Sequence, residues 1–363
     1  MPIKVLVVDD SALMRRQLTQ LFEAEGGFQI RIARNGREAV DENIQFQPDV
    51  ITLDINMPEM DGLTALAHIM AARPVPVVMV SSLTEKGALA TFEALALGAV
   101  DYVAKPGGTI SLSFDLVSEE LIRKVRAATL VKIKRAGSPP GGLAAKLRAD
   151  REAQKAATAA ARKPAFVRRS LGHTDGLVII GVSTGGPSTL EGILPLLPSD
   201  FPHPVIVAQH MPAAFTGPFS QRMDQMCALD VVEVTRPMEL TPGTVYVARG
   251  GADVAVTLRV GKLMVIAKPE AKEYLWHPSV EVLGRSVLEH CEAESVIAVM
   301  LTGMGYDGAD AFTELKKQGA RTIAESEDTA VVYGMPRELV ERKGASVVLP
   351  SHRIAEQIIG WVG

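Results

Sequence analysis

Side chains that could bind a metal ion and accept a phosphoryl group occur in the first third of the chain. The pair Asp9-Asp10 and Asp54 come directly after short apolar runs, and later runs end at Ser81 and at Lys105. Carboxylate oxygens are ligands that Mg²⁺ prefers, and a magnesium ion with Lys105 would neutralise charge on a phosphoryl group in transfer to a carboxylate. The spacing therefore predicts a phosphorylation site with bound magnesium.

A candidate nucleophile lies in the second half of the chain, within Gly181-Val182-Ser183-Thr184-Gly185. This Gly-x-Ser-x-Gly pattern follows the run Val178 to Ile180 and precedes a segment with helical spacing, as in a nucleophile elbow. Glycines allow a tight turn, and Pro187 suits the first turn of a helix. Ser183 would then lie at the positive end of a helix dipole, where an oxyanion or a phosphate is stabilised.

A histidine and an aspartate at two further strand ends could activate that serine. His210 directly follows Val205 to Ala208, and Asp307 lies in the turn after a later apolar run. His277 is a rival base, but no strand-like run immediately precedes it. Ser183, His210 and Asp307 would act as nucleophile, general base and the carboxylate that orients the base. Such triads are recognised by the roles of their members rather than by their order.

The elements that must position these residues are short β-branched runs separated by longer amphipathic segments. This alternation predicts parallel strands covered by helices, and thus α/β domains that bind ligands at the carboxyl ends of their strands. The runs in the first part are Val5 to Val8, Val50 to Leu53, Val75 to Val80 and Tyr102 to Ala104. Those in the second part are Val178 to Ile180, Val205 to Ala208, Val245 to Val247, Leu263 to Ile266, Val296 to Leu301 and Ser346 to Leu349.

The charge distribution separates two acidic domains by a basic connector. Residues 1–131 carry 12 basic and 17 acidic side chains, residues 132–169 carry 11 and 2, and residues 170–363 carry 15 and 23. The formal net charge of −4 conceals values of −5, +9 and −8 for these stretches. The connector is rich in Ala, Pro and Gly and has few large apolar side chains to offset the entropy of ordering. We therefore expect a flexible linker, with the chain divided at 1–128, 129–173 and 174–363.

Composition and the remaining residue types exclude several classes of protein. With 47% hydrophobic and 22% charged residues, the chain is neither disordered nor fibrous. No apolar run approaches the roughly 20 residues that span a bilayer, and the first residues enter a strand-like run, so we expect a cytoplasmic protein without a signal peptide. Cys227 and Cys291 have no Cys or His neighbour at ligand spacing, so neither a zinc site nor a disulfide framework is predicted.

Four short motifs mark the strand ends of the first domain: Val7-Val8-Asp9-Asp10-Ser11, Leu53-Asp54-Ile55-Asn56-Met57-Pro58, Met79-Val80-Ser81-Ser82 and Ala104-Lys105-Pro106. In these motifs residues 1–128 resemble the receiver domain of two-component response regulators. The resemblance implies a flavodoxin-like, doubly wound sheet of five parallel strands, with Asp54 as the phosphoacceptor. It also implies a magnesium site and a switch; the magnesium ligands would be Asp9, Asp10, Asp54 and the backbone carbonyl of Asn56, and the switch residues Ser81, Tyr102 and Lys105.

Four further motifs mark the second domain: Gly181 to Pro187, Gln209-His210-Met211-Pro212, Pro278-Ser279-Val280, and Leu301-Thr302-Gly303-Met304-Gly305 with Asp307-Gly308. In these motifs residues 174–363 resemble the catalytic domain of chemotaxis protein-glutamate methylesterases, whose architecture the receiver and linker also match. The resemblance implies a larger, Rossmann-like, doubly wound and mainly parallel α/β domain with Ser183, His210 and Asp307 as catalytic residues. Tyr306, where many members have Asn, and Arg249, in place of a usual Pro, are departures at the rim of the site.

The resemblance implies a phosphorylation-activated serine hydrolase. It would demethylate glutamyl methyl esters on chemotaxis receptors, releasing methanol, and deamidate specific glutamines, with backbone amides near Thr184 or Met304 binding the oxyanion. The implied partners are methyl-accepting chemotaxis receptors and a chemotaxis histidine kinase as phosphodonor. The implied cofactor is Mg²⁺ in the receiver, with none for the esterase reaction. We expect a monomer that acts at membrane-bound receptors without being a membrane protein.

Two other output functions fit part of the sequence. The basic linker would suit a response regulator that binds nucleic acid, but residues 170–363 carry a charge of −8 and show no helix-turn-helix pattern. We therefore expect no nucleic-acid partner. A nucleotide could bind the turn Gly181 to Gly186, although Ser183 occupies the middle glycine position of the dinucleotide-binding fingerprint.

Overall fold

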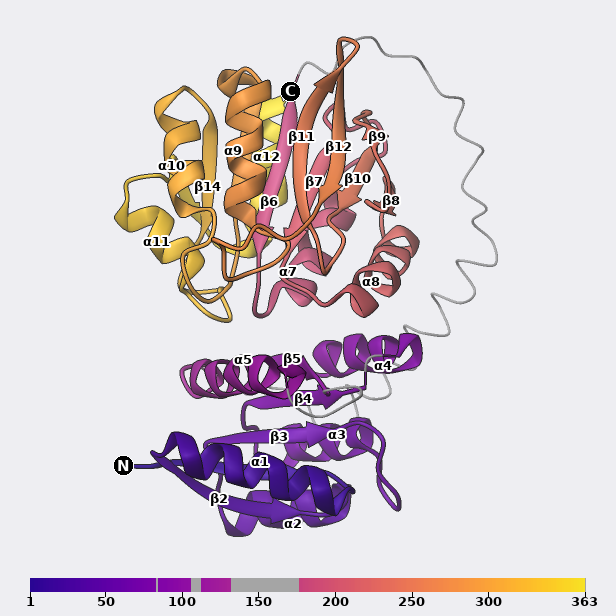
Figure 1. The fold of residues 1–363 in the computed structure, drawn as a ribbon, viewed down its shortest axis with the longest axis vertical. Helices are drawn as coiled ribbons and strands as arrows, with labels where there is room; N and C mark the ends of the chain where they lie inside the picture. The colour runs from indigo at the N-terminus through magenta and orange to yellow at the C-terminus, as the bar shows by residue number, and fades with distance from the viewer. Residues whose placement is uncertain (83, 106–111, 132–175, 363) are drawn as a thin grey trace. The chain divides into compact units, whose positions relative to one another are not determined.

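The computed structural model describes residues 1–82, 84–105, 112–131 and 176–362. The chain divides into two compact units, and each is described on its own (Figure 1). The predicted linker, residues 129–173, lies outside the described residues from 132 onward. In the described ranges, no helix is long and apolar enough to cross a membrane.

The first unit is built on a sheet of five parallel strands, paired in the order β2-β1-β3-β4-β5. The strands are β1 (Ile3–Val8), β2 (Phe28–Ala33), β3 (Val50–Asp54), β4 (Val77–Ser81) and β5 (Asp101–Ala104). The helices between residues 12 and 128 are α1 (Ala12–Glu25), α2 (Gly36–Gln45), α3 (Gly62–Ala72), α4 (Glu85–Ala96) and α5 (Leu112–Ala128). Every residue of β3 and β4 is buried, which explains their continuous apolar sequences. The predicted five-stranded parallel fold is confirmed.

The second unit contains a parallel sheet of seven strands. In chain order they are β6 (Leu177–Val182), β7 (Val205–Gln209), β8 (Asp230–Glu233), β10 (Thr244–Val247), β13 (Val296–Met300), β14 (Arg321–Glu325) and β15 (Val347–Leu349). The spatial order is β15-β14-β13-β6-β7-β10-β8, and every neighbouring pair runs parallel. The carboxyl ends of β13, β6 and β7 therefore lie side by side.

A small antiparallel sheet accompanies the parallel one. Its strands are β9 (Met238–Glu239), β11 (Asp253–Arg259) and β12 (Lys262–Lys268), in the order β11-β12-β9. The prediction that Leu263 to Ile266 forms a parallel strand is therefore wrong. Val260 and Gly261 adopt positive φ angles of 50° and 73°, and this tight turn returns the chain antiparallel to β11. The mainly parallel α/β character of the unit is confirmed.

One helix links the two sheets of the second unit. The buried residues Val280, Leu283 and Val287 of α9 (Val280–His290) share one apolar core with strands of both sheets. Figure 1 shows α9 between α10 and β11. The helices and short 3₁₀ segments of this unit are α7 (Gly186–Ile193), η1 (Leu194–Leu196), α8 (Ala213–Met226), α9, η2 (Ala293–Ser295), α10 (Ala309–Lys317), α11 (Met335–Glu341) and α12 (Ser351–Val362).

Candidate active site and phosphorylation site

The three aspartates of the first unit converge at the carboxyl edge of its sheet. Asp9 and Asp54 are buried and Asp10 is exposed, and one carboxylate oxygen of each lies within 4.8 Å of the others. The Nζ atom of Lys105 is 2.8 Å from Asp9 Oδ2 and 2.8 Å from Asp54 Oδ2. Such an all-oxygen set of carboxylates fits a hard divalent cation such as Mg²⁺.

Burial and ion pairing oppose each other in this cluster. Burial raises the pKa of Asp54, and the hydrogen bond and charge of Lys105 offset only part of the rise. For Lys105, burial alone would lower the pKa, but the contacts with Asp54 and Asp9 outweigh burial and leave the pKa raised. Lys105 is therefore positively charged at neutral pH, and its charge would partly neutralise the negative charge of a phosphoryl group on Asp54.

The residues predicted for the switch lie on the neighbouring strands. Ser81 ends β4 and is fully buried, and Tyr102 lies within β5 with 3% of its surface exposed. Burial raises the pKa of the Tyr102 hydroxyl well above its ordinary value. Asn56, predicted to supply a backbone ligand, follows β3 directly after Ile55. The structure thus gathers the predicted residues on β1, β3, β4 and β5 or directly after them.

Ser183 lies in the tight turn between β6 and α7. Gly185 adopts the left-handed conformation with φ 78°, which a residue with a side chain rarely does. A Cβ atom on Gly186 would lie 1.9 Å from Gln209 Oε1, so a side chain at this position would displace the Gln209 amide. The Ser183 amide donates to the Thr302 carbonyl at 2.9 Å, which ties the turn to the end of β13. The predicted strand, turn and helix arrangement is present.

His210 and Asp307 form a buried pair at the same sheet edge. His210 Nε2 lies 2.8 Å from Asp307 Oδ2. The Asp307 carboxylate also accepts from Ser279 Oγ at 3.0 Å and from the amides of Val280 at 2.7 Å and Glu281 at 3.0 Å. Asp307 therefore lies at the positive end of α9, although α10 is the helix that follows it in sequence.

The protonation state of this pair follows from its surroundings. Burial alone would raise the pKa of Asp307, but the hydrogen bond and charge of His210 and the two α9 amides outweigh burial and lower it. An ionised carboxylate only accepts hydrogen bonds, so His210 Nε2 carries the proton that is shared with Asp307. Nδ1 of His210 is buried and has no hydrogen-bond partner among the described residues. In particular, it does not accept a hydrogen bond from the Ser183 hydroxyl.

Gln209 is a residue of this site to which sequence reasoning assigned no role. Its Nε2 donates to the carbonyl of Ser183 at 3.0 Å and to the carbonyl of His210 at 3.0 Å. One side chain thus fixes the backbone of both the candidate nucleophile and the candidate base. The motif that contains it was visible in the sequence, but an amide bridging two carbonyls requires the pairing of β6 with β7.

Two backbone amides near Ser183 are available to a ligand. In the part of the chain that the structure describes, the amides of Thr184 and Met304 donate to no protein group. The Thr184 carbonyl accepts from the Thr302 hydroxyl at 2.8 Å, which holds this turn against the end of β13. The two predicted oxyanion donors therefore lie on loops that are tied together.

An aromatic stack covers the His210 ring. Trp276 lies parallel to it with a centroid distance of 6.1 Å and an interplanar angle of 6°. The Tyr306 ring lies perpendicular to the Trp276 ring, with a centroid distance of 5.2 Å and an interplanar angle of 89°, so this departure from the family pattern forms part of the rim. Arg249, the other departure, is exposed. The rival base His277 pairs with Asp253 rather than with Asp307.

A buried carboxylate lies behind the turn that follows β13. Glu325 is fully buried, and it accepts from the Thr302 amide at 2.8 Å and from the Thr329 hydroxyl at 2.9 Å. Burial raises the pKa of Glu325 more than these two donors lower it. A raised acid pKa favours the protonated folded state, so the stability of the fold decreases as pH rises from the usual glutamate value through the raised one.

We expect Glu325→Gln to raise the melting temperature at about pH 8 and to do so less at about pH 5, where the wild-type carboxyl is more protonated. The glutamine carbonyl can accept from Thr302, and its amide can donate to the Thr329 hydroxyl oxygen, so both contacts are kept. Thermal unfolding followed by circular dichroism at both pH values measures this, with the exposed Glu327→Gln as control. A lower melting temperature at the higher pH would contradict it.

Fold and site together define a response-regulator protein with an α/β output domain. Residues 5–113 match the family model described as response regulator receiver domain, and residues 178–358 match the model described as CheB methylesterase. The chain belongs to the CheB methylesterase family, as the motifs predicted.

Two relatives align with nearly the whole chain. A protein-glutamate methylesterase/protein-glutamine glutaminase of Rhodospirillum rubrum is 52% identical over 99% of this chain and 96% of its own length. Another, of Rhodopseudomonas palustris, is 51% identical over 99% of this chain and 98% of its own length. The CheB methylesterase catalytic domain of Thermotoga maritima is 38% identical with a TM-score of 0.50, covering 52% of this chain and 98% of that domain.

Proposed function

We propose that the protein hydrolyses glutamyl methyl esters on chemotaxis receptors, releasing methanol, and converts specific receptor glutamines to glutamates. The observation that carries this proposal is the His210 and Asp307 pair at the sheet edge that also carries the Ser183 turn. The names of the two nearly full-length relatives support the substrate. Ester and amide hydrolysis differ in the leaving group, methanol or ammonia, so one site can perform both.

In the first step the Ser183 hydroxyl attacks the carbonyl carbon of the substrate. Because Nε2 of His210 donates to Asp307, Nδ1 is the nitrogen that takes the serine proton. The amides of Thr184 and Met304 stabilise the negative oxygen of the tetrahedral intermediate. The proton on Nδ1 then passes to the methoxy oxygen, methanol leaves, and the glutamyl group remains as an ester on Ser183.

In the second step water takes the place of the serine hydroxyl. Nδ1 of His210 accepts a proton from the water as its oxygen attacks the acyl carbon, and returns that proton to Ser183 as the ester bond breaks. The products are a glutamate side chain and the starting enzyme. Methanol release from methylated receptor in membranes tests the proposal, with unmethylated receptor as control, and the absence of release would contradict it.

For the first domain we propose that Asp54 accepts a phosphoryl group from a chemotaxis histidine kinase. Asp9, Asp10, Asp54 and the backbone carbonyl of Asn56 would hold Mg²⁺, which would neutralise charge on the phosphoryl oxygens. Lys105, between two of these carboxylates, would contact the same oxygens.

The added charge on Asp54 would act through neighbouring side chains. Ser81 and Tyr102, on the next two strands, would rearrange in response and so activate the esterase. We propose a receiver at 1–128, a linker at 129–173 and a catalytic domain at 174–363, with the protein acting in the cytoplasm, where the kinase and the methylated receptor segments would be reached.

Asp54→Asn is expected to abolish phosphorylation by acetyl phosphate and the accompanying rise in methanol release, while the unphosphorylated rate stays unchanged. The asparagine amide is too weak a nucleophile to accept the phosphoryl group. Labelling with radioactive phosphodonor measures this, and chelation of Mg²⁺ should remove labelling of the wild type. Asp41→Asn, an exposed carboxylate of α2, is the matched control. Labelling of Asp54→Asn at the wild-type level would refute the assignment.

A further inference from the structure

We infer that Asp253 and His277 are positioning residues for the hydrolysis proposed above: they fix the segment 271–279, which places Trp276 on His210 and Ser279 on Asp307. This inference rests on the proposed function, because it assigns to these residues an effect on that reaction. Neither residue belongs to the sequence pattern that pointed to the nucleophile, the base and its carboxylate.

Asp253 ties both ends of this segment to one carboxylate. It begins β11, is 1% exposed, and its Oδ2 accepts from the Ala271 amide at 2.8 Å. Its Oδ1 accepts from His277 Nδ1 at 2.8 Å and from the Ser279 amide at 2.7 Å. A buried carboxylate that accepts from three donors has its hydrogen bonds made. An asparagine in its place would turn its own NH₂ group, which is also a donor, toward one of these donors.

The segment between these ties contains no helix or strand, so its shape depends on such contacts. It carries Trp276, whose ring covers His210, and Ser279, whose hydroxyl donates to Asp307 Oδ1 at 3.0 Å. The Ser279 amide meanwhile donates to Asp253. Ser279 therefore bridges two carboxylates, each of which holds a histidine, and a shift of the segment would move both supports of the His210 and Asp307 pair.

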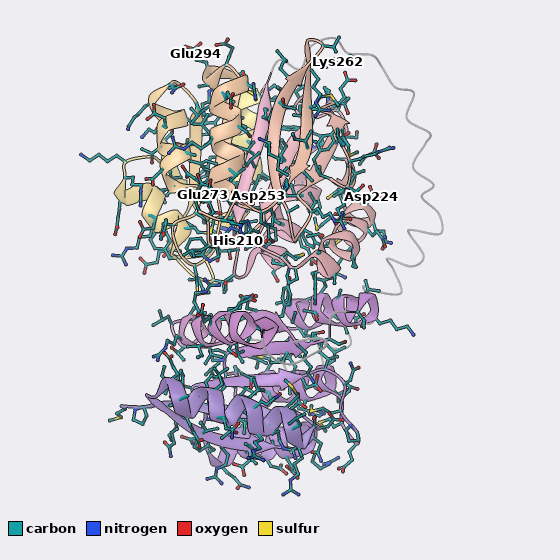
Figure 2. All side chains as sticks on the ribbon, viewed as in Figure 1. His210, Asp224, Asp253, Lys262, Glu273 and Glu294 are labelled. Carbon is teal, nitrogen blue, oxygen red and sulfur yellow. The ribbon has the colours of Figure 1, made fainter. Side chains whose placement is uncertain are left out.

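The antiparallel hairpin of β11 and β12 offers a control that distinguishes a positioning role of Asp253 from a general effect on stability. Asp253 lies at one end of the hairpin and Lys262 at the other, since Asp253 pairs with Lys268 and Arg259 pairs with Lys262. Figure 2 shows Asp253 close to His210, with Lys262 at the far end of the same hairpin. Lys262 forms an exposed ion pair with Glu239 at 2.8 Å, so Lys262→Gln is a control on the same element.

The test uses the full-length protein with Trp361→Phe, which leaves Trp276 as the single tryptophan of the two in the chain. In this background Asp253→Asn, His277→Ala, His277→Asn and Lys262→Gln are compared. For each, kcat and KM of methanol release, iodide quenching of Trp276 fluorescence and the melting temperature are measured. Fluorescence does not depend on activity, so failure of the proposed reaction in the parent protein would be distinguishable from failure of this inference.

Asp253→Asn and His277→Ala are expected to lower kcat by about 10- to 100-fold with a smaller change in KM, as a displacement of about 1 Å does at an active site. Both should also make Trp276 more accessible to iodide. His277→Asn, whose amide can donate where Nδ1 does, should restore most of the lost rate, and Lys262→Gln should match the parent protein. If Asp253→Asn does not fold, the comparison of His277→Ala with His277→Asn tests the inference by itself.

Three results would overturn the inference. Parental kcat in folded His277→Ala would show that the tie has no effect on the reaction. A loss of kcat without any change in iodide quenching would show that the effect does not pass through the segment. A failure of His277→Asn to exceed His277→Ala would show that the hydrogen bond donated to Asp253 is not what supports the reaction.

Discussion

Replacing Ser183 by alanine is expected to lower kcat for methanol release by about 10⁴-fold or more, because the acyl-enzyme then cannot form. KM should change little, since the hydroxyl contributes to the reaction rather than to holding a receptor helix. The melting temperature should stay near the wild-type value, because the Ser183 backbone, not its side chain, makes the hydrogen bonds to Thr302 and Gln209. Methanol release from methylated receptor measures the rate.

A matched control separates loss of the nucleophile from a disturbed helix start. Ser188 is exposed in the first turns of α7, five residues beyond Ser183, and Ser188→Ala should retain full activity. A probe that forms an acyl-enzyme should label wild type and Ser188→Ala but not Ser183→Ala. An undiminished rate in Ser183→Ala would exclude this serine as the nucleophile.

Asp307→Asn is expected to lower kcat by about 10³- to 10⁴-fold, because His210, the proposed base, then carries its proton on the wrong nitrogen. The carboxylate accepts from His210, Ser279, Val280 and Glu281, and asparagine has one acceptor oxygen for these four donors. If the asparagine amide donates to Nε2, the His210 proton moves to Nδ1, which can then no longer accept the serine proton. Methanol release at saturating receptor measures kcat.

The same variant has a signature in the pH dependence of stability. Because the pKa of Asp307 is lowered in the folded state, its ionised form stabilises the fold above the usual aspartate pKa, and this stabilisation is lost as pH falls through the lowered value. The free energy of unfolding should therefore decrease less steeply on acidification in Asp307→Asn than in wild type. Asp310→Asn, an exposed carboxylate on α10, is the control, and an equally steep decrease in Asp307→Asn would contradict the assignment.

The strand ends that carry the proposed site residues could be predicted from the sequence, because buried parallel strands have continuous apolar sequences. The runs before Asp9, Asp54, Ser183 and His210 all correspond to observed strands. Strand β14 was not predicted, since Arg321–Glu325 begins and ends with charged residues, and the fully buried Glu325 is unusual for a strand of this kind. The run Leu263 to Ile266 was wrongly predicted to be a parallel strand, because apolar runs do not distinguish parallel from antiparallel pairing.

The supports of the site could not be predicted for a different reason. Trp276 contacts His210 through a segment without regular structure, and no periodicity indicates where such a segment will lie. Asp307 accepts from the amides at the start of α9, which lies before it in the chain, and no local pattern around Asp307 indicates that contact. Contacts of this kind depend on how elements pack, which local sequence does not specify.

The strand order β13-β6-β7 has a consequence for access to Ser183, the proposed nucleophile. From β6 the chain first forms β7, then the edge strand β8, then β10 between those two, and only later returns to the other side of β6 as β13. The direction in which strands are added to the sheet therefore reverses at β6. Right-handed crossovers on the two sides of such a point place their helices on opposite faces of the sheet, so the loops at the carboxyl ends of β6 and its neighbours lead away from each other. The opening that leads to Ser183 is therefore set by the order of the strands in the sheet, and substitution of a rim residue such as Tyr306 should not close it.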